Sequence, residues 1–507
     1  MKVLYACAEL YPLLKTGGLA DVSAALPPAL QQAGCDVRVL LPGFPVVLAG
    51  LKKLATHPDV HPDINPDASG QVPLTLPSGQ GPQLPANTVA RIIRGELPGG
   101  LPCYVLDAPA CFDRPGSPYL NPQGQAWPDN AQRFALFSWA AACLGRGKDA
   151  LWQPDIVHCH DWHTGLVPLY LSLHPDGSGP RASSVFTIHN LAYQGLFPAE
   201  VFGSLGLPDH FFGIDGVEFY HQVSFMKAGL QFADCITTVS PGYAREILTP
   251  AQGCGLEGVL RSRSAALSGI LNGVDYLVWN PAHDAVLKKP FDWRSSGRKK
   301  QAKTQLQTRM GLTLRADTLV LGVVSRLTEQ KGLHLLAALL DDVVRMGAQL
   351  ALVGGGDPAI EQAFSDAAKK YPGQVAVTLG YDEALAHSII AGADVMVVPS
   401  WFEPCGLTQL YSLRYGTLPL VRRIGGLADT VVDASAAHLL DGTACGVVFD
   451  DFSVEGLKAA LHRTHDLYAQ PAVWKKMQKR AMQLRFDWQT AAGQYLALYR
   501  SLKPDAT

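Results

Sequence analysis

The sequence predicts an α/β protein with two domains in series, each built on a parallel sheet of the Rossmann type. Its 507 residues exceed what one hydrophobic core normally serves. Short apolar runs alternate with longer helical patterns, which is typical of βαβ units. A polar, basic stretch, LKKPFDWRSSGRKKQAK (287–303), separates two such regions. We therefore expect the domain junction between residues 270 and 300.

The first region begins with a predicted strand, KVLYACAE (2–9), a helix, LADVSAALPPALQQAG (19–34), and a strand, DVRVLLPG (36–43). Two strands joined by a helix run parallel. Residues 57–86 are rich in Pro, Gly and Gln and are expected to form loops and hairpins. The alternation then resumes in CYVLDAP, NAQRFALFSWAAACLG, PDIVHCHDWH, ASSVFTIHN and DCITTVS. Such continuous apolar strands are buried on both faces.

The second region repeats the pattern and ends in a helix. Its expected strands are TLVLGVVSR, QLALVGGG, VAVTLGY, DVMVVPS and TLPLVRR. The last helix starts near Asp487 and, by its position alone, fits either domain. We expect a first domain over 1–270, a second over 271–485 and a terminal helix over 486–507.

Composition excludes several classes of function. The formal net charge is −2, so no basic excess favours nucleic acid or membrane surfaces. No apolar run approaches the ~18 residues of a membrane span, and the start of the chain has no long apolar region typical of a signal peptide. None of the ten cysteines forms a C-x-x-C pair, so we expect reduced thiols and a cytoplasmic protein. The oligomeric state stays open.

A glycine pair follows the first predicted strand, in KTGGLAD (15–21). In an open parallel sheet, ligands bind beyond the carboxyl ends of the strands. Gly17 and Gly18 let the backbone approach a ligand, and the helix that follows offers free N–H groups to an anion. Lys15 adds charge, and we expect no nearby carboxylate to pair with it. A tight turn with a solvated lysine is the alternative.

A second copy of this motif, IGGLAD (424–429), follows the strand TLPLV and again precedes a helix. Both sheets therefore carry a glycine turn at the edge where ligands bind. Two such edges facing each other would form a cleft between the domains. The two copies need not act alike, because Gly425 and Gly426 have no lysine before them.

The histidines of HCHDWH (158–163) allow three interpretations. His158 and His160 share a face of a strand, so a metal pair is conceivable. No further cluster has metal-ligand spacing, which disfavours it. Hydrogen-bonded core histidines are the second interpretation. The third, preferred for His163, places Asp161 and His163 at the substrate cleft.

The stretch GGGDPA (354–359) matches G-x-G-x-x-A after a strand, which would indicate a dinucleotide site and an oxidoreductase. The match is weak, because it does not open the first βα unit of its domain. Asp357 and Pro358 suit a helix start equally well. An oxidoreductase therefore remains the rival hypothesis.

Charged residues follow two strands of the second region. Arg326 and Lys331 come just after a strand and are expected to bind an anion rather than form a solvated face. Glu403 follows another strand and precedes a helix start near Leu407, which is a second seat for phosphate. Because phosphate would repel Glu403, this carboxylate is better explained by hydrogen bonds to hydroxyls of a sugar. A common helix-start charge is the alternative.

Longer motifs carry a resemblance. KTGGLADV, HDWHTGL, TIHNLAYQG, LNGVD, VSRLTEQKGL, EPCGLTQLYSLRYGTLPLVRR and GGLADTV closely resemble the bacterial glycogen synthase and plant starch synthase family. They occur in family order from residue 15 to 431. The resemblance implies the GT-B fold, two Rossmann domains facing across a deep cleft, with the C-terminal helix returning to the first domain. It also implies a retaining transfer of glucose from ADP-glucose to the non-reducing end of an α-1,4-glucan, without a metal or other cofactor.

The resemblance also implies roles for single residues. Arg326 and Lys331 would neutralise the leaving diphosphate, Glu403 would face the glucose ring, and His163 would lie near the reacting carbon. With Asp129, which lies in WPDNAQRF on the sugar side, they form the candidate catalytic set. The candidate substrate-binding set is Lys15, Gly17, Gly18, Asp21, Asn272, Gly354, Cys405, Gly406 and Leu407.

Some points stay open at this stage. Many retaining GT-B enzymes carry a second glutamate eight positions after the first. This chain has Tyr411 at that position, in LTQLY, and the resembled family also carries tyrosine there. Residues 51–101 match no pattern, so regulation or acceptor binding there is open. UDP-glucose is an alternative donor. A catalytically silent glucan-binding protein is disfavoured because the charged candidates are all present.

Overall fold

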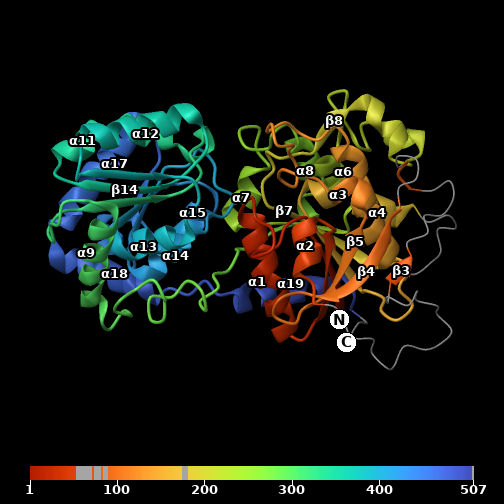
Figure 1. Ribbon diagram of the computed structural model, residues 1–507, viewed down its shortest axis with the longest axis horizontal. Coiled ribbons are helices and arrows are strands. Elements are labelled where there is room, and N and C mark those ends of the chain that lie inside the picture. Colours follow the sequence, from red (N-terminus) through yellow and green to blue (C-terminus); the bar gives the residue numbers. More distant parts are fainter. Residues whose placement is uncertain (53–70, 74–80, 84–88, 174–180, 505–507) are drawn as a thin grey trace. The chain divides into compact units, whose positions relative to one another are not determined.

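The computed structural model describes residues 1–52, 71–73, 81–83, 89–173 and 181–504. Most of the loop-rich segment predicted over 57–86 therefore lies outside the described residues. The chain divides into two compact units, Met1–Val239 with Ala244–Gly273 and Trp488–Thr507, and Ser240–Tyr243 with Val274–Asp487. Each unit has its own sheet and its own helices (Figure 1). Within the described residues, no helix is both long and apolar enough to cross a bilayer.

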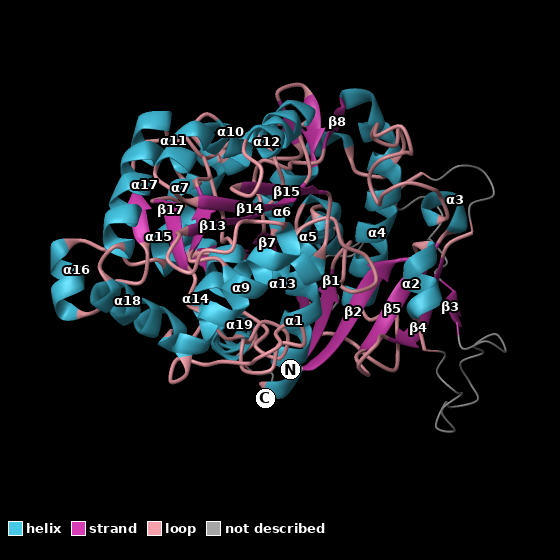
Figure 2. Ribbon diagram, turned by 60° about the vertical axis from the view of Figure 1, so that its left-hand side comes forward, coloured by secondary structure: helices cyan, strands magenta, loops and turns pink. Residues whose placement is uncertain are grey.

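The first unit is built on a nine-stranded sheet in the order β12-β11-β7-β6-β1-β2-β5-β4-β3. Seven strands are parallel, and β4 and β3 add an antiparallel edge. Figure 2 shows β1, β2, β5 and β4 side by side. The strands are β1 (Lys2–Ala6), β2 (Asp36–Pro42), β3 (Gln71–Pro73), β4 (Arg91–Glu96), β5 (Pro102–Asp107), β6 (Ile156–His160), β7 (Ser183–Ile188), β11 (Cys235–Thr238) and β12 (Leu267–Gly269). A separate small sheet contains β8 (Leu196–Pro198), β9 (Glu218–Phe219) and β10 (Gln222–Ser224).

Helices cover this sheet. They are α1 (Gly18–Gln32), α2 (Pro45–Gly50), α3 (Pro109–Phe112), α4 (Asn130–Gly145), α5 (Val167–Ser172), α6 (Phe225–Phe232), α8 (Glu257–Ser262) and α19 (Trp488–Leu502). A further helix, α7 (Pro241–Glu246), crosses the boundary between the units. The last helix, α19, packs against α1 at the opposite end of the sequence. Its Tyr499 Oη lies 2.8 Å from His158 Nδ1 inside the unit. The C-terminal helix thus belongs to the core of the first unit.

The second unit is built on six parallel strands in the order β15-β14-β13-β16-β17-β18. In chain order this is 3-2-1-4-5-6, the arrangement of a Rossmann fold, which reverses direction between its first and fourth strands. The reversal lies between β13 and β16, and the first unit reverses in the same way between β1 and β6. The strands are β13 (Val320–Val324), β14 (Gln349–Gly354), β15 (Val375–Leu379), β16 (Val395–Val398), β17 (Leu418–Arg422) and β18 (Val447–Phe449).

Both faces of this sheet are covered, with α12 and α17 on one side and α9 and α13 on the other (Figure 1). Residues alternate between the two faces, because Leu321 and Val323 belong to the core under α12 and α17, whereas Val320 packs with α9 and α13. The helices are α9 (Lys299–Met310), α10 (Leu333–Ala337), α11 (Leu340–Arg345), α12 (Pro358–Lys370), α13 (Glu383–Gly392), α14 (Thr408–Tyr415), α15 (Gly425–Thr430), α16 (Ala436–Asp441), α17 (Val454–Tyr468) and α18 (Pro471–Gln483).

The basic stretch 287–303 is not a free linker, since it leads into α9 and two of its lysines are buried. Lys303 Nζ lies 2.7 Å from an Asp394 carboxylate oxygen. Lys299 Nζ donates to the Ala391 carbonyl at 2.7 Å and to Thr417 Oγ1 at 2.6 Å. The chain passes from the first unit to the second between Gly273 and Val274, a position within the 270–300 range given for the junction. Buried polar contacts thus explain the basic composition here.

The histidines of β6 are core residues. His158 is fully buried and contacts Thr187 Oγ1 at 2.6 Å as well as Tyr499. His160 Nδ1 lies 2.9 Å from His189 Nε2. Burial lowers the pKa of His158 to about 3, and it lowers the pKa of His160 well below its usual value. Both rings are therefore neutral at ordinary pH, and both are core residues with hydrogen-bond partners, as the second interpretation predicted.

Candidate active site

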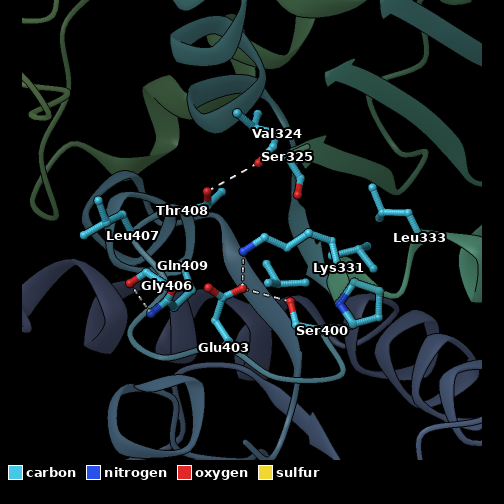
Figure 3. Close-up of a pocket in the computed structure, with 13 residues that line it drawn as sticks. Val324, Ser325, Lys331, Leu333, Ser400, Glu403, Gly406, Leu407, Thr408 and Gln409 are labelled. Carbon is cyan, nitrogen blue, oxygen red and sulfur yellow. Dashed lines mark hydrogen bonds and ion pairs between the residues drawn. The ribbon is translucent and has the colours of Figure 1, made fainter. Parts of the chain in front are cut away.

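A pocket opens at the reversal point of the second unit, beyond the carboxyl ends of β13 and β16. The loop after β13, the loop after β16 and the start of α14 form its wall, and Lys331, Glu403, Gly406 and Leu407 are among its lining residues (Figure 3). Open parallel sheets bind their ligands at this position, because the loops diverge there and leave a crevice. The pocket brings together four residues that the sequence marked as candidates.

Lys331 and Glu403 form an ion pair inside this pocket. Lys331 Nζ lies 2.6 Å from Glu403 Oε2, and Ser400 Oγ donates to the same oxygen at 2.9 Å (Figure 3). The Glu403 side chain is 7% exposed and that of Lys331 is 19% exposed. An ammonium group carries three donors, so the pair leaves donors of Lys331 for a second anion. Among the described residues, none donates to Glu403 Oε1, which leaves this oxygen for a ligand hydroxyl.

Arg326 lies on the same loop as Lys331 but on its exposed side. Its Nη2 lies 3.5 Å from Gln330 Oε1, and its side chain is outside the set that lines the pocket. The backbone carbonyl of Gln330 accepts from Trp401 N–H at 2.9 Å and so joins the two loops. Arg326 is therefore exposed and outside the pocket lining, while Lys331 lies within it.

The second glycine motif supports the loop that carries Glu403. Gly426 N–H donates to the Glu403 carbonyl at 3.1 Å. A Cβ atom on Gly426 would lie 2.2 Å from the Cys405 carbonyl oxygen, so only glycine fits. Gly406 has φ +70°, the left-handed region that favours glycine, and it turns the chain into α14. Cys405 is buried beneath this turn and does not line the pocket. Gly426 thus supports the loop that carries Glu403.

The GGGDPA glycines have a packing role. A Cβ atom on Gly354 would lie 1.8 Å from the Ser325 carbonyl oxygen, and one on Gly356 would lie 2.4 Å from that of Leu327. Leu327 N–H donates to the Gly355 carbonyl at 3.0 Å. These glycines let the loop after β14 press against the loop that carries Arg326. They follow the second strand of the sheet, whereas a dinucleotide fingerprint follows the first.

Tyr411 does not replace a pocket carboxylate. Its ring stacks on Trp279, with centroids 4.1 Å apart and planes 5° apart. Trp279 stacks on His387 in turn, with centroids 3.8 Å apart. Tyr411 thus faces the core of the second unit rather than the pocket, and Glu403 is the carboxylate that lines it.

In the first unit, Lys15 has a carboxylate partner, contrary to the expectation from the sequence. Its Nζ lies 2.7 Å from Asp21 Oδ1 on the first turn of α1. The first turn of α1 brings the Asp21 carboxylate close to Lys15, although six residues separate the two in sequence. Both side chains are partly exposed, at 30% and 27%, so this ion pair is weak and can be exchanged for a ligand anion.

The glycine turn itself is already occupied by an internal anion. Glu9 accepts from Thr16 N–H at 2.6 Å and from Gly17 N–H at 3.3 Å. These two amides of the turn are therefore not free to bind phosphate. Glu9 is 3% exposed and was missed in the sequence. The available signal was an acidic residue immediately after an apolar strand, close to the glycine turn.

His163 lies in a short 3₁₀ helix, Trp162–Thr164, after β6. Its ring stacks on Tyr119, with centroids 4.7 Å apart and planes 24° apart. Neither ring nitrogen has a hydrogen-bond partner among the described residues, although the side chain is buried. Buried polar atoms without partners are uncommon and point to a missing ligand. Burial lowers the pKa of His163 to about 3, so the ring is neutral.

The remaining candidates, Asp129 and Asn272, make contacts of their own. Asp129 precedes α4 and makes a two-point ion pair with Arg114, at 2.6 and 2.5 Å. Asn272 is buried next to Gly273, where a Cβ atom would lie 2.6 Å from the backbone nitrogen of Trp488. No group of three potential metal ligands comes together among the described residues.

Comparison with known proteins places these features in context. Residues 2–262 match the model of the starch synthase catalytic domain, and residues 307–481 match that of glycosyl transferases group 1. A glycogen synthase of Albidiferax ferrireducens is 57% identical over the whole of both chains. One of Francisella philomiragia is 51% identical over 99% of this chain and all of its own.

Solved structures agree with these matches. The catalytic domain of starch synthase IV from Arabidopsis thaliana, bound to ADP and acarbose, has a TM-score of 0.85 and 32% identity over 99% of each chain. A sucrose-phosphate synthase of Thermosynechococcus elongatus, at 19% identity and a TM-score of 0.57 over both full chains, shares the fold alone.

Proposed function

Since the chain belongs to the glycogen and starch synthase family of glycosyltransferases, we propose that it lengthens α-1,4-glucan by moving glucose from ADP-glucose to the non-reducing end. Its two Rossmann-type sheets confirm the GT-B fold that the resemblance implied. The observation that carries the proposal is the Lys331–Glu403 pair, buried in a pocket at the reversal point of the second sheet.

This pair suits a donor with a charged end and a neutral end. The diphosphate needs cations, which Lys331 and Arg326 would supply as negative charge grows on the leaving oxygen. The glucose ring needs hydrogen-bond acceptors, which Glu403 Oε1 would supply. The second unit would thus bind the nucleotide sugar, and Gly406 and Leu407 would supply backbone at the start of α14.

The first unit would supply the acceptor side, and its Lys15 would reach the donor. His163 carries two ring nitrogens without a protein partner and would contact the transferred glucose. Its neutral ring can hydrogen-bond a sugar hydroxyl without adding charge. We assign supporting roles in sugar binding to Asp21, Asn272 and Asp129. The last of these acts with Arg114 bound to it.

Donor competition tests the proposed function most simply. Purified protein with glycogen and equal concentrations of ADP-glucose and UDP-glucose, each with a distinct label, should incorporate label mainly from ADP-glucose. The new residues should be released by an exo-acting α-1,4-glucan hydrolase. Label incorporated mainly from UDP-glucose would show the same transfer with the alternative donor. Reduction of NAD without glucose transfer would favour the oxidoreductase hypothesis.

Chelation should leave the reaction intact. Lys331 and Arg326 can supply the positive charge that a divalent cation supplies in other phosphate chemistry. Initial rates in buffer with excess EDTA should match those in untreated buffer within twofold. A loss that only added Mg²⁺ or Mn²⁺ reverses would contradict the prediction.

The pH profile should carry no histidine limb from His163. With its pKa lowered from 6.5 to about 3, the ring stays neutral as the pH falls from 8 to 5 and gains a proton only near 3. His163→Asn should therefore lower kcat across the range without changing the shape of log(kcat/KM) against pH. A wild-type limb near pH 6.5 that disappears in the variant would show that His163 titrates during turnover.

Lys15→Ala should raise the donor KM about tenfold, the loss expected for one charged hydrogen bond of about 1.4 kcal/mol. The glycan KM should change little. Asp21→Asn keeps Lys15 but removes its ion-pair partner, so it should leave the donor KM near or below the wild-type value. Separate titrations of donor and glycan measure both. An effect of Lys15→Ala on the glycan KM alone would assign Lys15 to the acceptor.

A further inference from the structure

Glu9 is a buried carboxylate whose partners among the described residues are all uncharged donors. It accepts from the Thr16 and Gly17 amides, from Thr16 Oγ1, and from Tyr119 Oη at 2.5 Å. Burying a carboxylate without a cation is costly unless several hydrogen bonds replace its water. Four donors from two separate segments replace it here. Because the buried Glu9 carboxylate needs all of these hydrogen bonds, it fixes the positions of the groups that donate them.

One of these donors leads to His163. Tyr119 is 110 residues from Glu9 in sequence, and its ring stacks on the His163 ring. Burial, followed by the charge of Glu9, raises the pKa of Tyr119 well above its usual value, so its hydroxyl stays a donor. Asn130 Nδ2 donates to the Tyr119 carbonyl at 3.0 Å and fixes this segment. Contacts therefore run from the glycine turn through Glu9 and Tyr119 to His163.

This chain of contacts spans the reversal point of the first sheet. The glycine turn follows β1 and His163 follows β6, and these two strands are neighbours. Loops after neighbouring parallel strands that diverge have few backbone bonds to each other. Glu9 and Tyr119 supply the link between them by side chains.

We propose that Glu9 is a positioning residue, which acts with Tyr119 to fix both the turn that carries Lys15 and the ring of His163. The proposal rests on the proposed glucosyl transfer. It also changes the role of the glycine turn. With its Thr16 and Gly17 amides bound to Glu9, the turn presents the Lys15 side chain and is no cradle for phosphate, because a second anion there would be repelled.

Glu9→Gln tests the proposal. The carbonyl oxygen of the glutamine can still accept from the Thr16 and Gly17 amides, but as a neutral acceptor it holds them less tightly. Its NH₂ group replaces the oxygen that accepts from Thr16 Oγ1 and Tyr119 Oη, so both hydroxyls lose this acceptor. A displacement of about 1 Å is enough to lower a rate ~10²-fold. We expect kcat to fall roughly 10- to 100-fold, the glycan KM to stay within twofold and the donor KM to rise no more than in Lys15→Ala.

Tyr119→Phe keeps the stacked ring and removes a single hydrogen bond, so its loss in kcat should be smaller, roughly 3- to 10-fold. Combined with Glu9→Gln it should add less than its own factor, because both changes break one network. The matched control is Glu218→Gln, since this glutamate also accepts a backbone N–H, from His221 at 2.8 Å, on an exposed turn. It should leave all three kinetic constants unchanged.

A readout besides activity separates this proposal from the function on which it rests. Amide hydrogen exchange at Thr16 and Gly17 should be slow in the wild type and at least tenfold faster in Glu9→Gln. If the wild type transfers no glucose but exchange responds as stated, the proposed function fails and the contact stands.

Near-normal kcat in folded Glu9→Gln, losses that multiply in the double variant, or unchanged exchange would each overturn the positioning role. If Glu9→Gln does not fold, Tyr119→Phe and Thr16→Val carry the same test. Each removes one donor to Glu9, and a normal kcat in both would overturn the proposal.

Discussion

Lys331→Ala should lower kcat by ~10²–10³-fold, the usual cost of removing one group that stabilises charge in a transition state. Lys331 Nζ lies in the pocket, 2.6 Å from Glu403 Oε2, with donors to spare. As the glycosidic bond breaks, negative charge grows on the leaving phosphate oxygen. A cation placed there binds the transition state more strongly than the ground state, so its loss acts on kcat. The variant also leaves Glu403 buried without its counter-ion.

Arg326 extends this prediction. Arg326→Ala should fall in or near the same range, although its more exposed side chain favours the lower end. The double variant should lose less than the product of the two factors, because both cations act on one charge. Arg326→Lys should recover only part of the loss, since an ammonium lacks the forked geometry of a guanidinium.

Lys370→Ala is the matched control for both cations. This lysine is in the same unit and forms an exposed ion pair with Asp341, so its removal should leave kcat unchanged. Steady-state rates with saturating glycan, together with thermal unfolding, decide the matter. Both single variants at near-normal kcat with intact unfolding would mean that Arg326 and Lys331 are surface charges.

Glu403→Gln should lower kcat by a similar ~10²–10³-fold while ADP binds at least as tightly as to the wild type. The substitution keeps the size of a buried side chain and its bond from Ser400. It removes the negative charge that holds Lys331 and that faces the glucose ring. The ammonium group becomes freer to bind phosphate, whereas the developing positive charge on the sugar loses its nearby carboxylate.

Opposite effects on ADP affinity distinguish the two residues of the pair. Calorimetric titration with ADP should show weaker binding to Lys331→Ala and unchanged or tighter binding to Glu403→Gln. Ser400→Ala removes one neutral donor to Glu403 and should cost less than tenfold in kcat, as one ordinary hydrogen bond does. A Glu403→Gln enzyme within threefold of wild-type kcat would exclude a role for this charge in the reaction.

Local pattern was enough to predict most strands, because buried parallel strands are continuous apolar runs. All five strands expected in the second region are present as β13–β17. The short β18, Val447–Phe449, was missed, since three residues give no pattern. The composition of the basic stretch at 287–303 does not indicate that two of its lysines are buried, because a lysine bound to buried carbonyls, such as Lys299, has the same letter as a solvated one.

Some residues of the candidate site were predicted from the sequence and others were missed. Lys331 and Glu403 were both marked because each follows a strand, and the strand order of a Rossmann sheet brings the two loops together. Glu9 and Tyr119 were missed because their contact joins segments 110 residues apart, and nothing local indicates it. Asp21 was expected near a substrate, but its bond to Lys15 arises only once α1 has formed.

The central claim is that the pocket of Lys331 and Glu403 binds the diphosphate and sugar of the donor. A crystal structure of the protein with ADP-glucose would show whether it does. We expect diphosphate oxygens within hydrogen-bond distance of Lys331 Nζ and of the Arg326 guanidinium, with Glu403 facing a hydroxyl of the glucose. A diphosphate bound instead at the Gly354–Gly356 turn, or on the amides of Thr16 and Gly17, would contradict it.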